Sequence, residues 1–215
     1  MKQNEKGRSM IEMLGVLAII GVLSVMGIAG YQKAISKHYI NQTIQHITEM
    51  VQNTRIAMGA QKNYSGLGAT QADIANVMFT ADLAPKDMLV VDANGEFVKP
   101  YIFKNKFKGG VSMRAADKAI EGDKMAFIIH FDQLPKAACI DISTADWGGA
   151  NGNGYVGLVI NQTMPEDLRI PTCKPSAIAQ KGKATYCTGK GLMPIAAATN
   201  ACSDQKNNMV EIKFY

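Results

Sequence analysis

Formal charge is missing from one early part of this 215-residue chain. No Asp, Glu, Lys or Arg occurs between Glu12 and Lys33, although such residues make up 19% of the sequence. Leu, Ile, Val, Met, Gly and Ala dominate this run. A helix of roughly 20 such residues spans about 30 Å, the thickness of a bilayer core. The absence excludes an ordinary solvent-exposed segment and predicts a membrane-spanning helix.

The residues that flank the apolar run predict its orientation. Lys2, Lys6 and Arg8 precede it, and Tyr31 stands at its far end, where interfacial aromatic residues are common. The N-terminus is therefore expected inside the cell and the rest of the chain outside. A secretory signal would have a shorter apolar core and a small-x-small cleavage site. Here the run passes directly into a helical pattern at Gln32–His38.

Cysteine is absent from the chain before Cys139, and no two cysteines form a C-x-x-C pair. This spacing excludes the usual zinc and thioredoxin-type motifs. An even number of cysteines in an exported segment predicts disulfides instead. Four cysteines allow three connectivities. The residues concerned are Cys139, Cys173, Cys187 and Cys202.

Motifs for chemistry are also scarce. The three histidines, His38, His46 and His130, are too far apart in sequence to suggest a shared metal site, and we expect them to be packing or surface residues. The G-x-G-x-x-G match at 152–157 leads into a β-rich run, which favours a glycine-rich loop over a dinucleotide site. The basic residues are scattered without interleaved aromatics. We therefore expect no enzyme, no cofactor, no metal and no direct nucleic-acid binding.

Glu12, at the start of the apolar run, is the residue that a plain membrane anchor does not explain. A carboxylate costs about 2.5–3.5 kcal/mol near the bilayer centre on insertion scales, and less toward the edge. The position of Glu12 therefore predicts a partner for its charge.

Apolar residues continue at helical spacing beyond Tyr31, which predicts one helix from about Ser9 to about Gly59. Its second half is amphipathic and is expected to pack on a globular head. Gly27 and Gly30 weaken the helix near the membrane exit, so a bend or melted turn is expected there. The apolar positions are Ile40, Ile44, Ile47, Val51, Thr54 and Met58.

The rest of the chain predicts an α+β head. Thr70 is a good N-cap for one short helix, and Pro135 is suited to the first turn of another. Asn94-Gly95 predicts a hairpin-like turn between Met88–Val91 and Glu96–Lys99. Further strands are expected at Val111–Arg114, Met125–Phe131, Tyr155–Asn161 and Met209–Phe214.

The N-terminal motif resembles the processing site and first helix of type IV pilins. It reads Gly7-Arg8-Ser9-Met10-Ile11-Glu12 and is followed by the apolar run. The resemblance implies cleavage after Gly7 by a prepilin peptidase and N-methylation of the new terminus, Arg8. It also implies that Glu12 is the partner of a neighbouring subunit's terminal amine. Arg8 stands where the family usually has Phe or Met.

The head is similar to type IVb pilins, a group that includes toxin-coregulated, bundle-forming and conjugative thin-pilus pilins. The similarity lies in a strand ending at Phe131 followed by Leu134-Pro135 and Ala138-Cys139, and in the segment 105–110. Ala201-Cys202 before a terminal strand matches the closing segment of these pilins. The resemblance implies a Cys139–Cys202 disulfide and leaves Cys173 to pair with Cys187.

The resemblance also implies the organisation of the chain. Expected parts are a prepilin leader at 1–7, a transmembrane and assembly half of the helix at 8–31, an amphipathic half at 32–61, and a pilin head at 62–215 with a disulfide region at 139–202. The expected fold is α+β, with the long helix packed on an antiparallel sheet.

The implied function is that of a structural subunit of a type IV pilus, a homo-oligomer in a helical filament. Its expected partners are the prepilin peptidase and the pilus assembly platform. The subunit would cross the bacterial inner membrane once, N-terminus inside, before it joins an extracellular pilus. The alternatives are a minor pilin or tip adhesin with a role in cell adhesion, and a pseudopilin of type II secretion.

Overall fold

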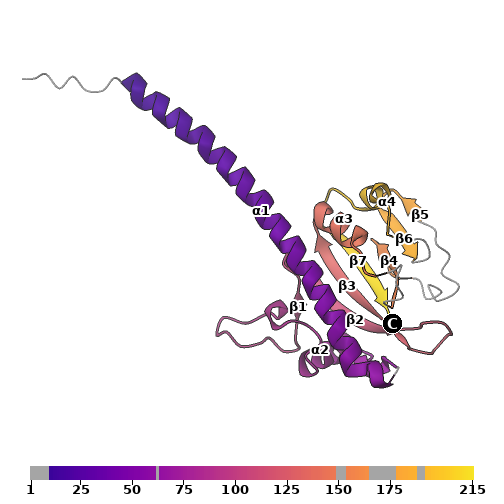
Figure 1. Cartoon of the computed structure of the whole chain (residues 1–215). Coiled ribbons are helices and arrows are strands. Elements are labelled where there is room, and N and C mark those ends of the chain that lie inside the picture. Colours follow the sequence, from indigo (N-terminus) through magenta and orange to yellow (C-terminus); the bar gives the residue numbers. More distant parts are fainter. Residues whose placement is uncertain (1–9, 62, 149–153, 165–177, 188–191) are drawn as a thin grey trace, which may run out of the picture. The chain divides into compact units, whose positions relative to one another are not determined.

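The computed structural model describes residues 10–61, 63–148, 154–164, 178–187 and 192–215. Contacts between residues divide the chain into two compact units, Met1–Tyr39 and Ile40–Tyr215. One helix, α1, belongs to both units because it runs from Met10 to Met58 (Figure 1).

Helix α1 confirms the predicted long helix over its described residues. The melted turn expected at Gly27 and Gly30 was wrong, because both residues lie inside uninterrupted helix. A helix satisfies its own backbone hydrogen bonds, and in an apolar segment that requirement outweighs the cost of two glycines. A short 3₁₀ turn, Gly59–Gln61, continues the helix.

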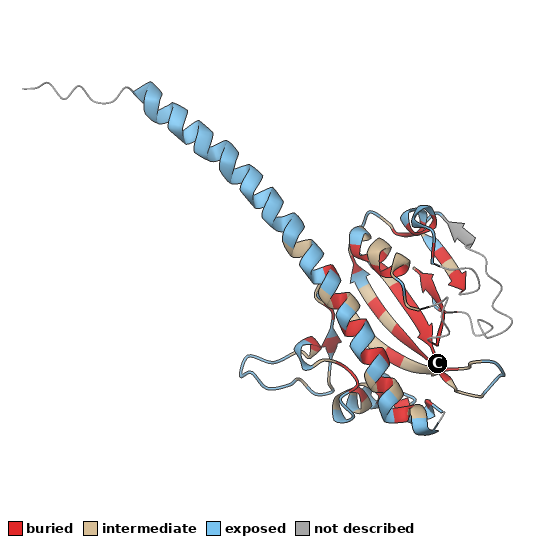
Figure 2. Ribbon diagram, in the orientation of Figure 1, coloured by how far each residue is buried: buried red, intermediate tan, exposed pale blue. Residues whose placement is uncertain are grey.

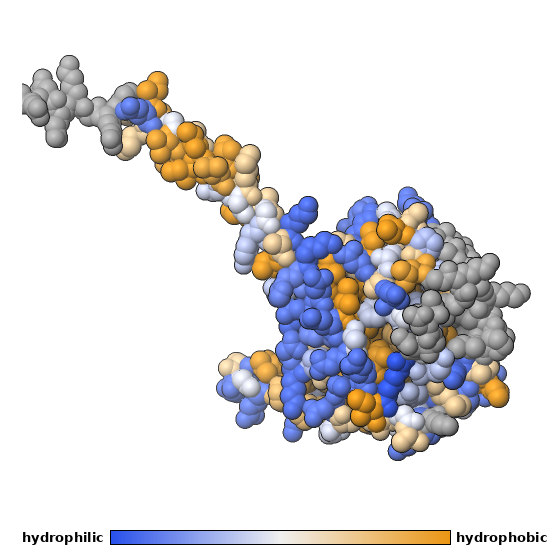
Figure 3. Space-filling model, in the orientation of Figure 1, coloured by the Kyte–Doolittle hydropathy of each residue, from blue (hydrophilic) through white to orange (hydrophobic). Residues whose placement is uncertain are grey.

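The part of α1 in the first unit is apolar on all sides from Met13 to Tyr31, with Ser24 as its one polar side chain apart from Tyr31, and polar residues follow from Gln32. Its residues Met10–Tyr39 are exposed or half-buried, and none is buried. Figure 3 shows the apolar residues gathered along this part of the helix.

The part of α1 in the second unit is amphipathic, as predicted. Its buried residues recur every three or four positions, whereas its opposite face is polar and exposed (Figure 2). The buried residues are Ile40, Thr43, His46, Ile47, Met50, Val51, Thr54 and Met58.

The head contains a seven-stranded antiparallel sheet with the strand order β1-β2-β3-β7-β4-β6-β5. The C-terminal strand β7 therefore lies in the middle of the sheet, between β3 and β4. The strands are β1 Phe103–Lys104, β2 Gly110–Ala116, β3 Ala126–Leu134, β4 Tyr155–Ile160, β5 Ile178–Gln180, β6 Lys183–Cys187 and β7 Asn208–Phe214. The strands expected from the sequence correspond to β2, β3, β4 and β7, whereas β1, β5 and β6 were missed.

Two of the head's helices were expected. Helix α2, Gln71–Thr80, begins with a capping box in which Thr70 Oγ1 accepts the N–H of Asp73 at 3.2 Å and Asp73 Oδ2 accepts the N–H of Thr70 at 3.3 Å. Helix α3, Lys136–Thr144, follows Pro135. Helix α4, Ile195–Ala201, was missed, and short 3₁₀ turns lie at Ser65–Leu67 and Lys86–Met88.

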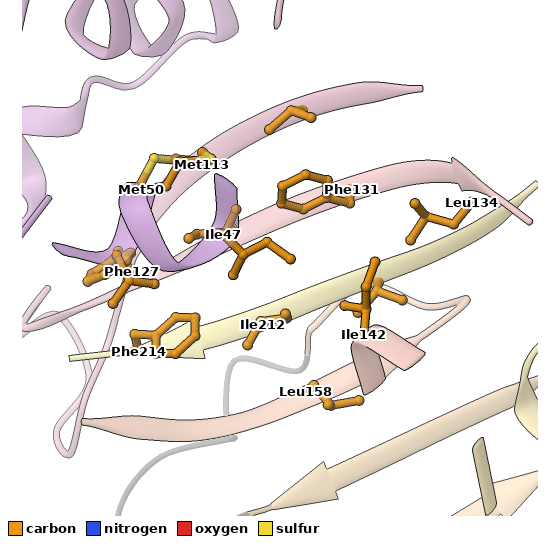
Figure 4. Close-up of a cluster of buried hydrophobic side chains, with 14 of the residues drawn as sticks. Ile47, Met50, Met113, Phe127, Phe131, Leu134, Ile142, Leu158, Ile212 and Phe214 are labelled. Carbon is orange, nitrogen blue, oxygen red and sulfur yellow. The ribbon is translucent and has the colours of Figure 1, made fainter. Parts of the chain in front are cut away.

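The main core lies between α1 and the sheet. Ile47 and Met50 of α1 lie in one cluster with Phe127, Phe131 and Ile212 (Figure 4). Each of these side chains is fully or almost fully buried. Burial of one such side chain contributes about 1.5–3 kcal/mol, so this cluster fixes the second half of α1 to the head.

Two turns explain sequence features of the head. The expected turn at Asn94-Gly95 is present, with Val91 bridged to Phe97 and with Asp92 Oδ1 accepting the N–H of Asn94 at 2.8 Å. In the segment before β2, Asn105 Oδ1 accepts the N–H of Gly109 at 3.1 Å. A Cβ atom at Gly109 would lie 2.0 Å from the carbonyl oxygen of Asp132, so only glycine fits there.

Candidate assembly helix and disulfide-braced head

The first half of α1 is the exposed apolar feature of the chain. It contains one stretch long and apolar enough to cross a membrane, and no residue of that stretch is buried within the chain. Contiguous apolar surface of this size marks a membrane or protein contact. The composition of this segment suits a contact with lipid or with other helices.

Glu12 lies in the first turn of α1, at the end of this apolar surface. A carboxylate in the first turn interacts favourably with the helix dipole. Within the described part of the chain, no cation forms an ion pair with Glu12. Gly7 and Arg8 lie outside the described residues, so cleavage between them and methylation of Arg8 stay predictions.

Other residues of the apolar helix suit a contact between helices. The hydroxyl of Ser24 donates to the carbonyl oxygen of Ile20 at 2.7 Å, which satisfies this polar group within the helix. A Cβ atom added at any of the four glycines would meet nothing within 4 Å in the chain's own fold. Small residues on such helices let another helix approach closely. The glycines are Gly15, Gly21, Gly27 and Gly30.

The head is braced by a disulfide between Cys139 and Cys202 that joins α3 to the end of α4. Both cysteines are buried, and their Cα atoms are 6.0 Å apart. This bond was expected from the resemblance to type IVb pilins and is confirmed. Cys187 is buried at the end of β6, whereas Cys173 lies outside the described residues. The Cys173–Cys187 pairing stays a prediction.

Two asparagine amides hold the region around this disulfide, and sequence reasoning missed their role. Asn208 is fully buried, and its Nδ2 donates to the carbonyl oxygens of Leu134 and Ser203 at 3.0 and 3.1 Å. Asn161 Nδ2 donates to Asn208 Oδ1 at 3.1 Å and to the carbonyl of Ala201 at 3.0 Å. The amides thus link β4, β7 and the end of α4. An Asn next to an apolar strand end was the only sequence signal for this role.

A buried acid, Glu211, organises the polar residues of β7 and its neighbours. Its carboxylate accepts hydrogen bonds from Arg114 Nη2 at 2.8 Å and from the backbone N–H of Met164 at 2.7 Å, and it lies 3.2 Å from His130 Nδ1. Burial alone would raise the pKa of Glu211, but the contacts with His130, Met164 and Arg114 hold the pKa below its usual value. His130 therefore has a structural partner, consistent with the packing or surface role expected for it.

His46 connects α1 to the 3₁₀ turn Lys86–Met88 of the head. Its Nε2 lies 3.3 Å from Asp87 Oδ2, and the same oxygen accepts Lys106 Nζ at 2.6 Å. Burial lowers the pKa of His46, although Asp87 acts in the other direction. His46 is thus a packing residue, and His38 is exposed on the same helix.

No cluster of three or more His, Cys, Asp or Glu that could bind a metal occurs among the described residues.

Comparison with known proteins identifies the family. A family model described as PilS N-terminal matches residues 37–214, most of the chain. The chain belongs to the PilS family. The match starts after the apolar run, so it rests on the head and is independent of the N-terminal motif. No curated protein matches this PilS chain.

Solved structures show the fold of this PilS chain. The type IVb pilin of Salmonella typhi is 16% identical and has a TM-score of 0.50, with 80% of this chain and 97% of that chain covered. TcpA, a type IV pilin from Vibrio cholerae El Tor biotype, is 13% identical with a TM-score of 0.52, and 83% and 99% of the two chains are covered. The predicted type IV pilin fold, of the type IVb kind, is therefore confirmed.

Proposed function

We propose that this PilS-family chain is a structural subunit of a type IV pilus and polymerises through its N-terminal helix. The observation that carries the proposal is the apolar half of α1, in which no residue is buried among the described parts of the chain, whereas the head has a buried core of its own. Lipid covers this surface before assembly, and the corresponding helices of neighbouring subunits cover it in the fibre. The fold shared with solved type IV pilins supports this assignment.

Processing is the step that makes the subunit competent for assembly in this proposal. A prepilin peptidase cuts after Gly7, and the amine of Arg8 becomes the methylated N-terminus. That amine pairs with Glu12 of a neighbouring subunit. A carboxylate and an ammonium are each costly alone in lipid, but they offset one another when they meet. The sequence motif around Gly7 and the position of Glu12 in the first turn support this step.

The proposed route begins in the bacterial inner membrane, with a single span and the N-terminus inside. The assembly platform then extracts the subunit into an extracellular pilus. Lys2, Lys6 and Arg8 before the apolar run support this orientation.

Sheared surface fibres from the producing cells test the proposal. A dominant band whose mass spectrum begins at Arg8, with one added methyl group, is the expected result. Trace amounts of the band would instead indicate a minor pilin or tip adhesin. Absence of the band together with impaired protein secretion would indicate a pseudopilin and would contradict the proposal.

A further inference from the structure

A second apolar cluster lies on the face of the sheet that is turned away from α1. Along β3, Phe127 and Ile129 belong to the main core beneath α1, whereas Ile128 between them points to the other face. Among the buried residues described in this cluster, Met164 is the one that no strand supplies, and it is 3% exposed. The segment that carries Met164 therefore covers part of this face. The buried members of the second cluster are Ala116, Ala126, Ile128, Val159, Met164 and Cys187.

Polar contacts hold this segment, residues 161–164, on the sheet. The chain leaves β4 at Asn161, whose φ is +54°. Gln162 Nε2 donates to the carbonyl oxygen of Ala184 at 3.0 Å. The backbone N–H of Met164 donates to Glu211 Oε2 at 2.7 Å. The end of the segment is thus attached through a carboxylate, so the attachment depends on the charge of Glu211.

Glu211 lies among charged groups from several elements. Its Oε2 also accepts Arg114 Nη2 at 2.8 Å, and its Oε1 lies 3.2 Å from His130 Nδ1. The other ring nitrogen of His130 lies 3.9 Å from Asp132. Lys213, two residues further along β7 on the same face, is 1% exposed. The residue opposite Glu211 on β4 is the apolar Val159. Further charged residues line the cavity shared by Arg114, Lys213 and Met164, and they are Glu121 and the ion pair of Asp117 with Lys124.

Protonation of Glu211 would weaken this arrangement in two ways. A neutral carboxyl accepts the N–H of Met164 less strongly than a carboxylate does, because hydrogen bonds to charged groups are stronger. Protonation also leaves Arg114 and Lys213 with one carboxylate fewer beside them, and like charges repel more strongly where water is excluded. The segment 161–164 therefore has its weakest attachment when Glu211 is neutral.

The pH range follows from the pKa of Glu211. Burial alone would raise this pKa, but the contacts with His130, Met164 and Arg114 hold it below the ordinary value of 4.5. A carboxylate whose pKa is lower in the folded chain stabilises the fold above its unfolded pKa, and this contribution is lost as the pH falls through the folded pKa. The contact is therefore complete above pH 4.5 and is lost in more acidic surroundings.

We propose that Glu211 is an acid-sensitive switch that controls access to the second apolar cluster. While its carboxylate is charged, it holds the segment 161–164 over the cluster. When the carboxylate is protonated, the segment leaves the sheet, and Met164, Ile128 and Val159 become accessible. In acid the head then presents an apolar surface that is buried at neutral pH, and exposed apolar surface of this kind is a contact site for other molecules. The inference concerns the head alone and does not depend on filament assembly.

Oxidation of methionine measures the opening in the full chain in nanodiscs of zwitterionic lipid. Brief exposure to hydrogen peroxide converts an accessible thioether to the sulfoxide, and mass spectrometry of peptides gives the rate at each methionine. Met113 and Met50, which are 1% and 0% exposed in the main core, report global unfolding.

Between about pH 7 and about pH 3, the oxidation rate of Met164 is expected to rise at least about tenfold relative to Met113, as for the loss of one hydrogen bond to a charged group. If Met164 stays protected at about pH 3, or if its rate rises only together with those of Met113 and Met50, the proposal is overturned. This measurement needs no variant.

Glu211→Gln tests the carboxylate itself. The variant carries no charge at any pH, so Met164 should already be oxidised about tenfold faster at neutral pH, with little further change in acid. Glu96→Gln removes an exposed acid of the hairpin-like turn and should behave as the original protein does. Protection of Met164 at neutral pH in a folded Glu211→Gln variant would overturn the proposal. Should this variant not fold, the pH series of the original protein still decides.

Arg114→Gln tests the neighbouring cation. Arg114 is 38% exposed, and its charge helps to keep Glu211 ionised. Loss of a cation in contact with a carboxylate raises the pKa of the carboxylate, so Met164 should become accessible at a pH higher by about one unit or more. Lys136→Gln removes another cation that is paired with an acid, Asp204, and should leave the opening pH unchanged. An opening pH that is unchanged or lower in Arg114→Gln would overturn the proposal.

Discussion

The two halves of α1 have the same secondary structure and opposite surroundings. Every buried residue of the helix lies in Ile40–Met58, whereas Met10–Tyr39 has none. A short isolated helix is only marginally stable in water, and a helix in a protein gains most of its stability from packing of one face. The second half obtains that packing from the head, and under the proposed function the first half obtains it from lipid or from neighbouring subunits. A substitution should therefore affect either assembly or head stability, according to the half in which it lies.

The largest effect on assembly is expected from Glu12→Ala. If Glu12 neutralises a neighbouring subunit's amine in an apolar setting, its loss leaves that charge without a partner at a cost of about 2.5–3.5 kcal/mol. Yield of sheared fibres should fall by about 100-fold, while membrane insertion and the melting temperature of the head stay unchanged. Glu49→Ala, an exposed acid in the other half of the same helix, is the matched control. Normal piliation in Glu12→Ala would contradict the pairing.

The disulfide should affect the head alone. The double variant Cys139→Ser with Cys202→Ser opens a loop with a sequence separation of 63 residues. In the chain-entropy model such a bond contributes about 4 kcal/mol by restricting the unfolded chain. Urea unfolding followed by tryptophan fluorescence measures the loss of stability. The amount of the original protein and of the variant recovered in membranes is the control for insertion. An unchanged unfolding midpoint would show that the disulfide does not stabilise the head.

Truncation of an isoleucine in each half tests the comparison directly. Ile47 is fully buried and Ile19 is 62% exposed. Ile47→Ala leaves a cavity in the core and should lower the free energy of unfolding of the head by about 2–5 kcal/mol. Ile19→Ala should leave that free energy within about 0.5 kcal/mol of the original value. Similar losses in both variants would mean that the first half also packs on the head.

A smaller effect on the stability of the head is expected when the pH is lowered, because His46 connects α1 to the head. Burial lowers the pKa of His46 below its unfolded value of 6.5. The unfolded chain then binds a proton that the folded head does not, so stability is complete above pH 6.5 and falls as the pH decreases below it. His46→Gln retains an N–H for Asp87 and has no proton to bind. Its unfolding free energy should depend less on pH between 7.5 and 5.5, and an equal slope in both proteins would exclude this role.

Local signals in the sequence predicted the elements that have a strong pattern of their own. Charge exclusion predicted the first half of α1, a three- and four-residue spacing predicted the second, and Thr70 and Pro135 marked the starts of α2 and α3. The elements that were missed, β1, β5, β6 and α4, are short. A strand of two residues or a helix of seven gives too few positions for a period to be recognised.

The resemblance to type IVb pilins predicted the Cys139–Cys202 bond, which spacing alone left as one of several connectivities. The roles of Asn161, Asn208 and Glu211 were not predicted. Each depends on partners far away in the sequence, such as Leu134 for Asn208 and Arg114 for Glu211. No local pattern marks such a partner, so sequence reasoning could treat these residues only as ordinary polar positions of a strand.

The sequence by itself determined that Met13–Gln32 needs an apolar environment, because this follows from the transfer free energies of its residues. For Glu12 it gave the prediction of a partner. Only the tertiary structure decided that β7 lies between β3 and β4, and that Asn161 and Asn208 join β4, β7 and the end of α4. These features depend on contacts between residues distant in sequence. Helical period and strand alternation report the face of an element that is buried, but not the element that covers it.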